Sequence, residues 1–267
     1  MNLYQLLLTQ NECYKSGRSF TPKGIMVHST GANNPRLSRY IGPDDGRLGK
    51  NPYSNHWNQA RPEGRQICCH AFIGKLADGS VATYQTLPWT MRGWHGAKGP
   101  KGSVNDTHLG FEICEDGLTD KAYFKAAFRE AVELCAYLCT MFHLDPLGDG
   151  VIIGHYEGYK RGIASNHGDP ANWFPKHGES MDTFRAAVKA AMEGKTLAPI
   201  PVPPATEERT HTIIKGDTLW SLAVRYLGNG QKWPKIQALN GGPEKCDPYK
   251  LRIGRVLQIP EKEEKSK

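Results

Sequence analysis

The sequence predicts an α/β domain, a mixed β-sheet flanked by helices, followed by a second and much smaller module. Short apolar runs typical of strands alternate with helical periodicity over residues 1–195, the pattern expected of an α/β sheet protein. Four prolines then fall within residues 197–204. Because proline fixes φ and lacks a backbone donor, this stretch cannot join a helix or a central strand. We therefore expect a first domain over 1–195, a linker over 196–209, a module over 210–260 and a charged tail over 261–267.

The strands of the first domain are marked by apolar runs and turn residues. The runs cover residues 23–28, 69–75, 80–85, 108–114 and 151–154. Asp78 and Gly79, between the second and third runs, are a strong hairpin signal. Apolar residues recur at intervals of three and four over 121–143, which predicts an amphipathic helix. An alanine- and lysine-rich helix over 181–192 closes the domain.

The second module is expected to fold as a βααβ unit with a small core. Its order is a strand, two helices, a long loop and a strand, over residues 211–214, 218–226, 233–240 and 255–259. Asp217 or Thr218 can cap the first helix. The helix then places its apolar residues on one face.

Composition limits the class of protein. With 39% apolar and 23% charged residues among 267, the chain is typical of a soluble globular protein. No apolar run reaches the roughly 18 residues of a membrane span, so none is expected. The net charge is +7, and residues 210–267 hold eleven Lys/Arg against six Asp/Glu. That excess suggests a polyanionic partner, although a solvated lysine-rich surface would give the same count. Nucleic acid is not expected, because no motif interleaves basic and aromatic residues.

Cysteines and the first residues bear on the cellular compartment. Seven cysteines, an odd number, argue against a disulfide framework and for reduced, structural thiols. Residues 1–15 have a short apolar run, no basic residue before it and no small-residue cleavage site. They do not resemble a secretory signal, so we expect synthesis in the cytoplasm without a signal peptide.

Two histidines stand at expected strand ends, where a scaffold can direct a side chain into a cleft. His28 ends the first strand, His155 follows the run over 151–154, and Asp169 comes fourteen residues later. Two imidazoles and a carboxylate fill three corners of a zinc tetrahedron and leave the fourth for water. A strand-end histidine is more often a hydrogen-bonded structural residue, so this spacing alone leaves both interpretations open. No His-Glu-x-x-His sequence is present, which excludes the helical zinc-protease pattern.

Five ordered sequence blocks carry a resemblance to a known family. They are Ile25–Thr30, Cys69–Ile73, Trp94–Ala97, Leu109–Ile113, and Gly154–Glu157 with His167–Pro170. In order and context they resemble type 2 N-acetylmuramoyl-L-alanine amidases, the family that includes phage lysozyme-like amidases and peptidoglycan recognition proteins. The resemblance covers about residues 20–180. It implies the amidase type 2 fold and hydrolysis of the amide bond between N-acetylmuramic acid and L-alanine in bacterial peptidoglycan.

The resemblance also implies roles for individual residues. It carries the ligands of a catalytic Zn²⁺ over to His28, His155 and Asp169, and it makes Glu112 the residue that moves the proton of the attacking water. Many relatives have a lysine two residues before the acidic ligand, where this chain has His167. A protonated imidazole there could stabilise the oxyanion, and activity would then fall as pH rises. His167 could also compete with Asp169 as the third ligand.

Some of these residues have a plain structural alternative. His70, Trp94 and His95 lie in the family-like blocks and are expected to line the cleft and contact substrate, with structural roles equally open. Strand alternation places Glu112 on the opposite face from its two apolar neighbours. An edge-strand surface carboxylate would fit that pattern too.

The second module resembles a LysM domain. Residues 211–223 and 247–260 are similar to its two halves, and together they cover nearly all of 211–260. The resemblance implies that N-acetylglucosamine-containing chains bind between the loop after the first strand and the loop before the last. The residues so placed are Gly216, Asp217, Thr218, Leu219, Pro248, Leu251 and Ile253. Leu219 and Ile253 could instead belong to the module's core.

These observations predict a zinc-dependent peptidoglycan amidase anchored to the wall by LysM, with anionic wall polymers as a second candidate partner. A catalytically silent recognition protein on the same fold is the alternative. Because no signal peptide is expected, we predict a phage or prophage endolysin that acts on the wall after a holin opens the membrane. A bacterial autolysin is the alternative to that role.

Overall fold

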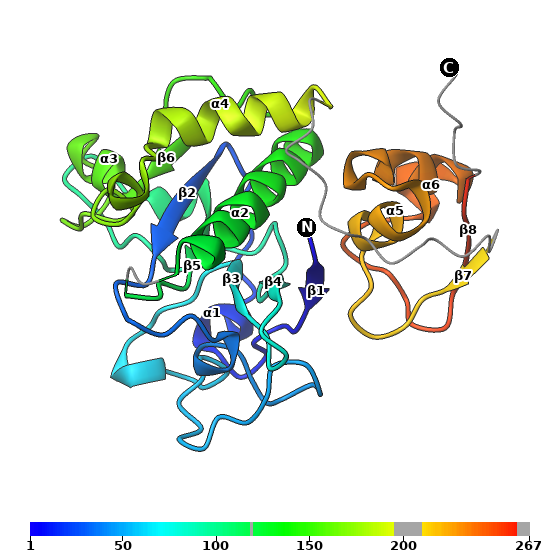
Figure 1. Cartoon of the computed structure of the whole chain (residues 1–267), viewed down its shortest axis with the longest axis horizontal. Coiled ribbons are helices and arrows are strands. Elements are labelled where there is room, and N and C mark those ends of the chain that lie inside the picture. The colour runs from blue at the N-terminus through cyan, green and yellow to red at the C-terminus, as the bar shows by residue number, and fades with distance from the viewer. Residues whose placement is uncertain (118–119, 195–209, 261–267) are drawn as a thin grey trace.

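The first domain is built on a mixed six-stranded sheet (Figure 1). The computed structural model describes residues 1–117, 120–194 and 210–260. The linker predicted for 196–209 and the tail predicted for 261–267 lie outside the described residues. The strand order is β1-β4-β3-β5-β2-β6, with β1 Leu3–Gln5, β2 Gly24–Ser29, β3 Ala71–Lys75, β4 Val81–Gln85, β5 His108–Ile113 and β6 Ile152–Gly154.

Four of the strands run in one direction. β2 pairs in parallel with β5 and with β6, and β3 pairs in parallel with β5. β4 is antiparallel to β3, as the predicted hairpin requires, and β1 is parallel to β4. The carboxyl ends of β3, β5, β2 and β6 therefore meet at one edge of the sheet, where parallel-stranded proteins commonly place their sites.

Two long helices cover one face of the sheet (Figure 1). Helix α2, Lys121–Phe142, begins where the Asp120 carboxylate accepts hydrogen bonds from two backbone N–H groups, and it ends at His143 in the left-handed conformation. Helix α4, Met181–Met192, packs on α2, with the rings of Phe184 and Phe128 5.3 Å apart. Helix α2 lies where the apolar periodicity predicted it, and α4 lies where the alanine- and lysine-rich composition did.

The opposite face is covered by the loop region between β2 and β3. It includes the 3-10 turns Leu37–Arg39 and Pro62–Gly64, and its buried Leu37 and Ile41 pack with Phe72 of β3. Phe72 alternates with Ala71 and Ile73, which belong to the core under α2. The region is therefore a structural layer of the domain, and it gives the sheet its second cover.

Several short elements have no counterpart in the sequence analysis. They are β1, the helices α1 Glu12–Lys15, α3 His155–Lys160 and α7 Gly242–Lys245, and the 3-10 turns Val104–Asp106, Phe174–His177 and Gly230–Lys232. Each has three to six residues, too few for a periodic pattern to show.

The second module has the predicted βααβ order. It consists of β7 Thr210–Thr212, α5 Leu219–Leu227, α6 Trp233–Leu239 and β8 Val256–Gln258, with β7 antiparallel to β8. Thr218 is the residue that caps α5, because its hydroxyl accepts a hydrogen bond from the Ser221 N–H. The short α7 lies within the expected long loop.

The two modules share an apolar core. The ring of Tyr137 on α2 lies 5.1 Å from that of Trp220 on α5 and 5.9 Å from that of Trp233 on α6. All three side chains are at most 6% exposed. At the edge of this contact, Gly216 lies against Tyr4 of β1, and a methyl group on Gly216 would stand 3.8 Å from that ring. The module therefore sits beside α2 and β1 (Figure 1).

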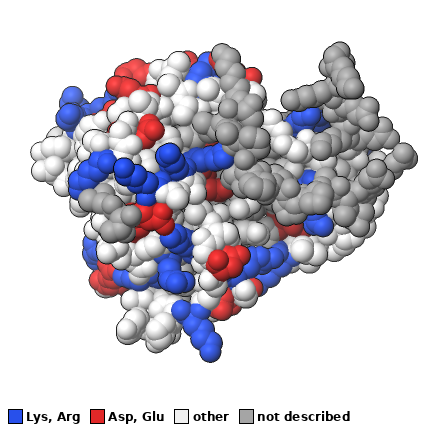
Figure 2. Space-filling view, in the orientation of Figure 1, with Lys and Arg blue, Asp and Glu red and all other residues white. Residues whose placement is uncertain are grey.

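All seven cysteines are free and buried, as expected of structural thiols. Burial raises the pKa of Cys68, Cys69 and Cys135 well above that of an ordinary thiol, which keeps them protonated. Within the described residues, no helix is long and apolar enough to cross a membrane. On the face seen in Figure 2, basic and acidic side chains are interspersed.

Candidate active site

Three potential metal ligands from separate parts of the chain meet at the carboxyl edge of the sheet. His28 is the penultimate residue of β2, His155 begins α3 directly after β6, and Asp169 lies in the loop that follows. Their ligand-capable atoms all lie within 4.8 Å of one another. His28 Nδ1 is 3.0 Å from Asp169 Oδ2 and 3.1 Å from His155 Nδ1, and His155 Nδ1 is 3.5 Å from Asp169 Oδ1. His167 is not a member of this group.

The hydrogen bonds behind His28 fix its tautomer. His95 Nε2 lies 3.1 Å from the carbonyl oxygen of His108, which can only accept, so His95 carries its proton on Nε2. Its Nδ1 therefore accepts, and the atom 3.0 Å away is His28 Nε2, which must donate. A neutral His28 that donates from Nε2 has a lone pair on Nδ1. That lone pair faces His155 and Asp169.

The charge state of the site suits a cation. Burial lowers the pKa of His28, and it lowers that of His95 still further, so both rings stay neutral. Burial alone would raise the pKa of Asp169, but the His155 and His28 rings beside the carboxylate outweigh it and hold the pKa well below its usual range. A carboxylate and an imidazole lone pair would repel each other at 3.0 Å unless a positive charge lies between them. Two neutral imidazoles and a carboxylate are a donor set that Zn²⁺ prefers.

Glu112 stands next to this group on the neighbouring strand. It pairs with His28 across β5 and β2, while Phe111 and Ile113 point into the core, as alternation predicted. Burial raises its pKa well above the usual carboxyl range, and the negative charges of Asp169 and Glu115 add to the shift. Its Oε2 is buried and has no hydrogen-bond partner among the described residues. A carboxyl group in this state is suited to take up and release a proton.

His167 lies at the exposed rim, joined to the group through Ser165. The Ser165 hydroxyl is 3.2 Å from His155 Nε2 and 3.0 Å from His167 Nδ1, and the His155 and His167 rings are 4.6 Å apart. His167 thus stands beside the ligands without joining them. The sequence analysis missed Ser165, since a lone serine in a loop carries no distinguishing pattern.

The residues expected to contact substrate differ in their surroundings. His70 is 1% exposed; its Nδ1 accepts from the Gly110 N–H and its Nε2–H donates to the Met91 carbonyl, so its contacts fit the structural alternative. His95 contacts His28 and orients it. Trp94 is partly exposed and packs with the guanidinium group of Arg92 5.2 Å from its ring.

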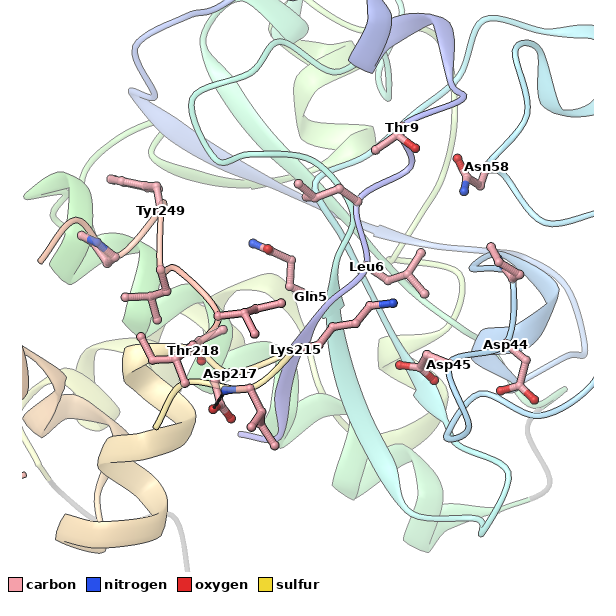
Figure 3. Close-up of a pocket in the computed structure, with 18 residues that line it drawn as sticks. Gln5, Leu6, Thr9, Asp44, Asp45, Asn58, Lys215, Asp217, Thr218 and Tyr249 are labelled. Carbon is pink, nitrogen blue, oxygen red and sulfur yellow. Dashed lines mark hydrogen bonds between the residues drawn. The ribbon is translucent and has the colours of Figure 1, made fainter. Parts of the chain in front are cut away.

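Most of the residues expected to bind glycan line a cavity, and one of them is a core residue. Gly216, Asp217, Thr218, Pro248, Leu251 and Ile253 line one cavity at the edge of the second module (Figure 3). Leu219 does not line it; this side chain is fully buried in the core. Ile253 is 67% exposed and is not a core residue. Asp217 also organises the loop, because its Oδ2 accepts from His211 Nε2 and from the Ile214 N–H.

Comparison with known protein families agrees with this geometry. A model of the N-acetylmuramoyl-L-alanine amidase family matches residues 18–172, more than half of the chain. The chain belongs to this amidase family. In the same comparison, residues 211–260 of the amidase match the LysM domain. The protein is thus a peptidoglycan amidase with a LysM wall-binding module.

Solved structures similar to the amidase cover its first domain. The hydrolase AmiA of Staphylococcus aureus, solved with its ligand, is 20% identical, with 73% of this chain and 86% of that chain covered and a TM-score of 0.50. The catalytic domain of XlyA is 21% identical, with 70% and 99% covered and a TM-score of 0.48. A mutant endolysin from Bacillus subtilis is 21% identical, with 70% and 99% covered and a TM-score of 0.47. At these identities the likeness to AmiA concerns the fold alone. Among curated proteins, none matches the amidase.

Proposed function

We propose that the amidase binds Zn²⁺ through His28, His155 and Asp169 and hydrolyses the bond between the lactyl group of N-acetylmuramic acid and L-alanine. The observation that carries this proposal is the convergence of three ligand atoms within 4.8 Å, with the His28 lone pair directed at the other two. Zinc at this position would acidify the attacking water and polarise the scissile carbonyl.

The remaining chemistry falls to residues of the chain. Glu112 would accept the proton of the attacking water and return it to the leaving amine of alanine, a transfer that its raised pKa favours. His167, at the rim beside His155, would donate a hydrogen bond to the oxygen that becomes negative. Ser165 orients both rings through its hydroxyl.

Product analysis tests the reaction. Digested peptidoglycan should yield new amino groups of L-alanine and no new reducing sugar ends. Purified amidase should hold about one zinc per chain, the number one such site binds. His28→Ala should lose both zinc and activity, whereas His143→Asn, which removes an exposed histidine at the end of α2, should retain both. New reducing ends would identify a glycosidase and contradict the proposal.

The same assay distinguishes the catalytically silent alternative. A recognition protein would bind muropeptide and expose no new L-alanine amino groups, with zinc or without it. New L-alanine amino groups whose appearance depends on zinc and on Glu112 would exclude that alternative. The lowered pKa of the Asp169 carboxyl and the raised pKa of Glu112 favour the enzyme, since perturbed groups of this kind concentrate at catalytic sites.

We further propose that the LysM module anchors the amidase to the wall. Ile253 offers an exposed apolar side chain in the cavity, and Val256, on β8, is 56% exposed but does not line it. Ile253→Asp should weaken sedimentation with insoluble walls, while Val256→Asp should leave it unchanged. Equal binding by both variants would remove this anchoring role. Anionic wall polymers are a second candidate ligand, which walls stripped of these polymers would test.

The biological role that fits a wall amidase with an anchor is that of a phage or prophage endolysin. In that role the protein reaches the wall after a holin opens the membrane. Expression in a bacterial host should therefore cause lysis only when a holin is produced with it. Lysis without a holin would favour export by another route and an autolysin.

A further inference from the structure

A cavity of about 380 Å³ lies between the two modules and has walls from both (Figure 3). The LysM module contributes residues 213–218 together with Pro248, Tyr249, Leu251 and Ile253. The catalytic domain contributes Gln5 at the end of β1, then Leu6, Leu7 and Thr9, the loop at 43–45, and Asn58. The volume falls within the roughly 300–1,000 Å³ of small-molecule sites. The glycan groove expected for LysM is therefore only one wall of a partly open cleft.

The relative position of the two walls is set by packing. The edge-to-face contacts of Tyr137 with Trp220 and Trp233 hold α5 and α6 on α2, and Gly216 meets Tyr4 next to the cavity. A buried aromatic contact of this kind resists separation, because each ring would lose about 1.5–3 kcal/mol of burial. The cavity is thus a permanent feature of the folded chain.

The lining combines apolar surfaces with polar groups, as a sugar ring requires. Ile214 and Ile253 are 52% and 67% exposed, unusually high for large apolar side chains, and both line the cavity. Figure 3 shows Gln5 and Lys215 extending into the space between the walls. A pyranose ring has apolar C–H faces and a rim of hydroxyl groups, so it can stack on the isoleucines and bond to the polar groups.

The charges favour a neutral ligand. Three carboxylates, those of Asp44, Asp45 and Asp217, line the cavity, and Lys215 is its one ammonium group among the described residues. Asp44 Oδ1 accepts from the N–H groups of Gly46 and Gly49, and its second oxygen has no partner among the described residues. An excess of carboxylates repels phosphate-rich polymers and offers acceptors to sugar hydroxyls.

We propose that the catalytic domain and the LysM module together form one binding site for a chain of N-acetylated amino sugars, held between the 5–9 segment and the LysM loops. This inference rests on the proposed wall anchoring and extends it to the catalytic domain. Four strand spacings separate β1 from β2, so β1 lies about 19 Å across the sheet from β2, the strand of His28, and the held sugar lies on the β1 side. The fixed separation sets where along a glycan strand the amidase cuts relative to its anchor.

Binding of a chitin-derived tetrasaccharide of N-acetylglucosamine to the full-length protein tests the proposal. Thr9 and Gln10 are adjacent and both exposed, but only Thr9 lines the cavity. Calorimetry should show at least about 10-fold weaker binding for Thr9→Trp, which fills the cavity, and unchanged binding for the control Gln10→Trp. The control Gln10→Trp should keep wild-type turnover of a soluble muropeptide that is too short to reach the anchor.

A second measurement locates the ligand, because a tryptophan at position 9 could also obstruct the LysM wall. On titration of the wild-type protein with the tetrasaccharide, backbone amide resonances of Gln5, Leu6 and Asp45 should shift together with those of Gly216 and Asp217. Shifts confined to the LysM residues would overturn the shared site and leave wall anchoring intact. A wild-type protein that binds neither tetrasaccharide nor walls would remove both proposals.

Discussion

Replacing His95 with alanine should weaken zinc binding although His95 is not a ligand. The His95 ring accepts the His28 Nε2–H at 3.0 Å and is itself fixed by the His108 carbonyl at 3.1 Å. Without this acceptor, His28 is free to place its proton on Nδ1 and to rotate away from Asp169. Loss of such a hydrogen bond behind a metal ligand typically costs 10- to 100-fold in affinity, or about 1.4–2.7 kcal/mol.

The assay is competition for zinc against a chromophoric chelator at neutral pH. His95→Asn should recover much of the affinity, because the amide oxygen of asparagine can accept from His28 Nε2 in place of His95 Nδ1. His143→Asn, at an exposed residue that is not part of the cluster, should bind zinc like the wild type. If His95→Ala bound zinc with wild-type affinity, the deduction that His95 sets the His28 tautomer would be wrong.

Three further outcomes are expected. Glu112→Gln should lower kcat by about 10²- to 10⁴-fold while zinc content stays constant. Because its pKa is raised and the base must be ionised, wild-type activity should fall on acidification at a pH well above the usual carboxyl range, as a pH–rate profile would show. Burial lowers the pKa of His70 from 6.5 to about 4. On acidification the His70 ring is therefore protonated in the unfolded chain at a higher pH than in the folded one. This protonation should lower the free energy of unfolding by about 3 kcal/mol between neutral pH and pH 4, as measured in urea titrations. The decrease should be smaller in His70→Gln, which lacks the titrating ring. Trp220→Ala should cost about 3–5 kcal/mol by opening the contact between the modules, whereas Tyr53→Ala, at a side chain 82% exposed, should change stability by less than about 0.5 kcal/mol.

The long elements of the fold could be predicted because their patterns are long. Helix α4 has the bounds that its composition indicated, and α2 ends one residue before the predicted limit, at a histidine with φ 55°. The hairpin of β3 and β4 follows from its Asp-Gly turn. In contrast, β1 has three residues, and it forms a strand because it pairs with β4, a partner almost eighty residues away. No local pattern records such a pairing.

The candidate site shows the same limit in chemical terms. Strand ends and motif order indicated His28, His155 and Asp169, and the structure brings their ligand atoms together. His95 belonged to the candidate set, but only the three-dimensional contacts show that it orients His28 and does not stand as an independent substrate contact. Ser165 was not indicated at all. A residue that orients a metal-binding side chain is recognised by the atom of that side chain to which it hydrogen-bonds. The spacing of residues along the chain does not contain that information.

The contact between the modules was hidden for a related reason. Tyr137 continues the apolar periodicity of α2, and Trp220 continues that of α5, so each residue looks like internal core of its own module. A proline-rich linker is typical of a semi-rigid spacer between two independently folding units, but a linker does not decide whether the units dock on each other. The buried rings favour the docked arrangement. Separating the modules would expose Trp220 and Tyr137 to solvent and lose burial worth several kcal/mol. A docked LysM module must present its sugar-binding loops toward the catalytic domain or away from it. Here the loops proposed to bind sugar line one cavity with Gln5 and Leu6, which is why the proposed shared site includes the first residues of the chain.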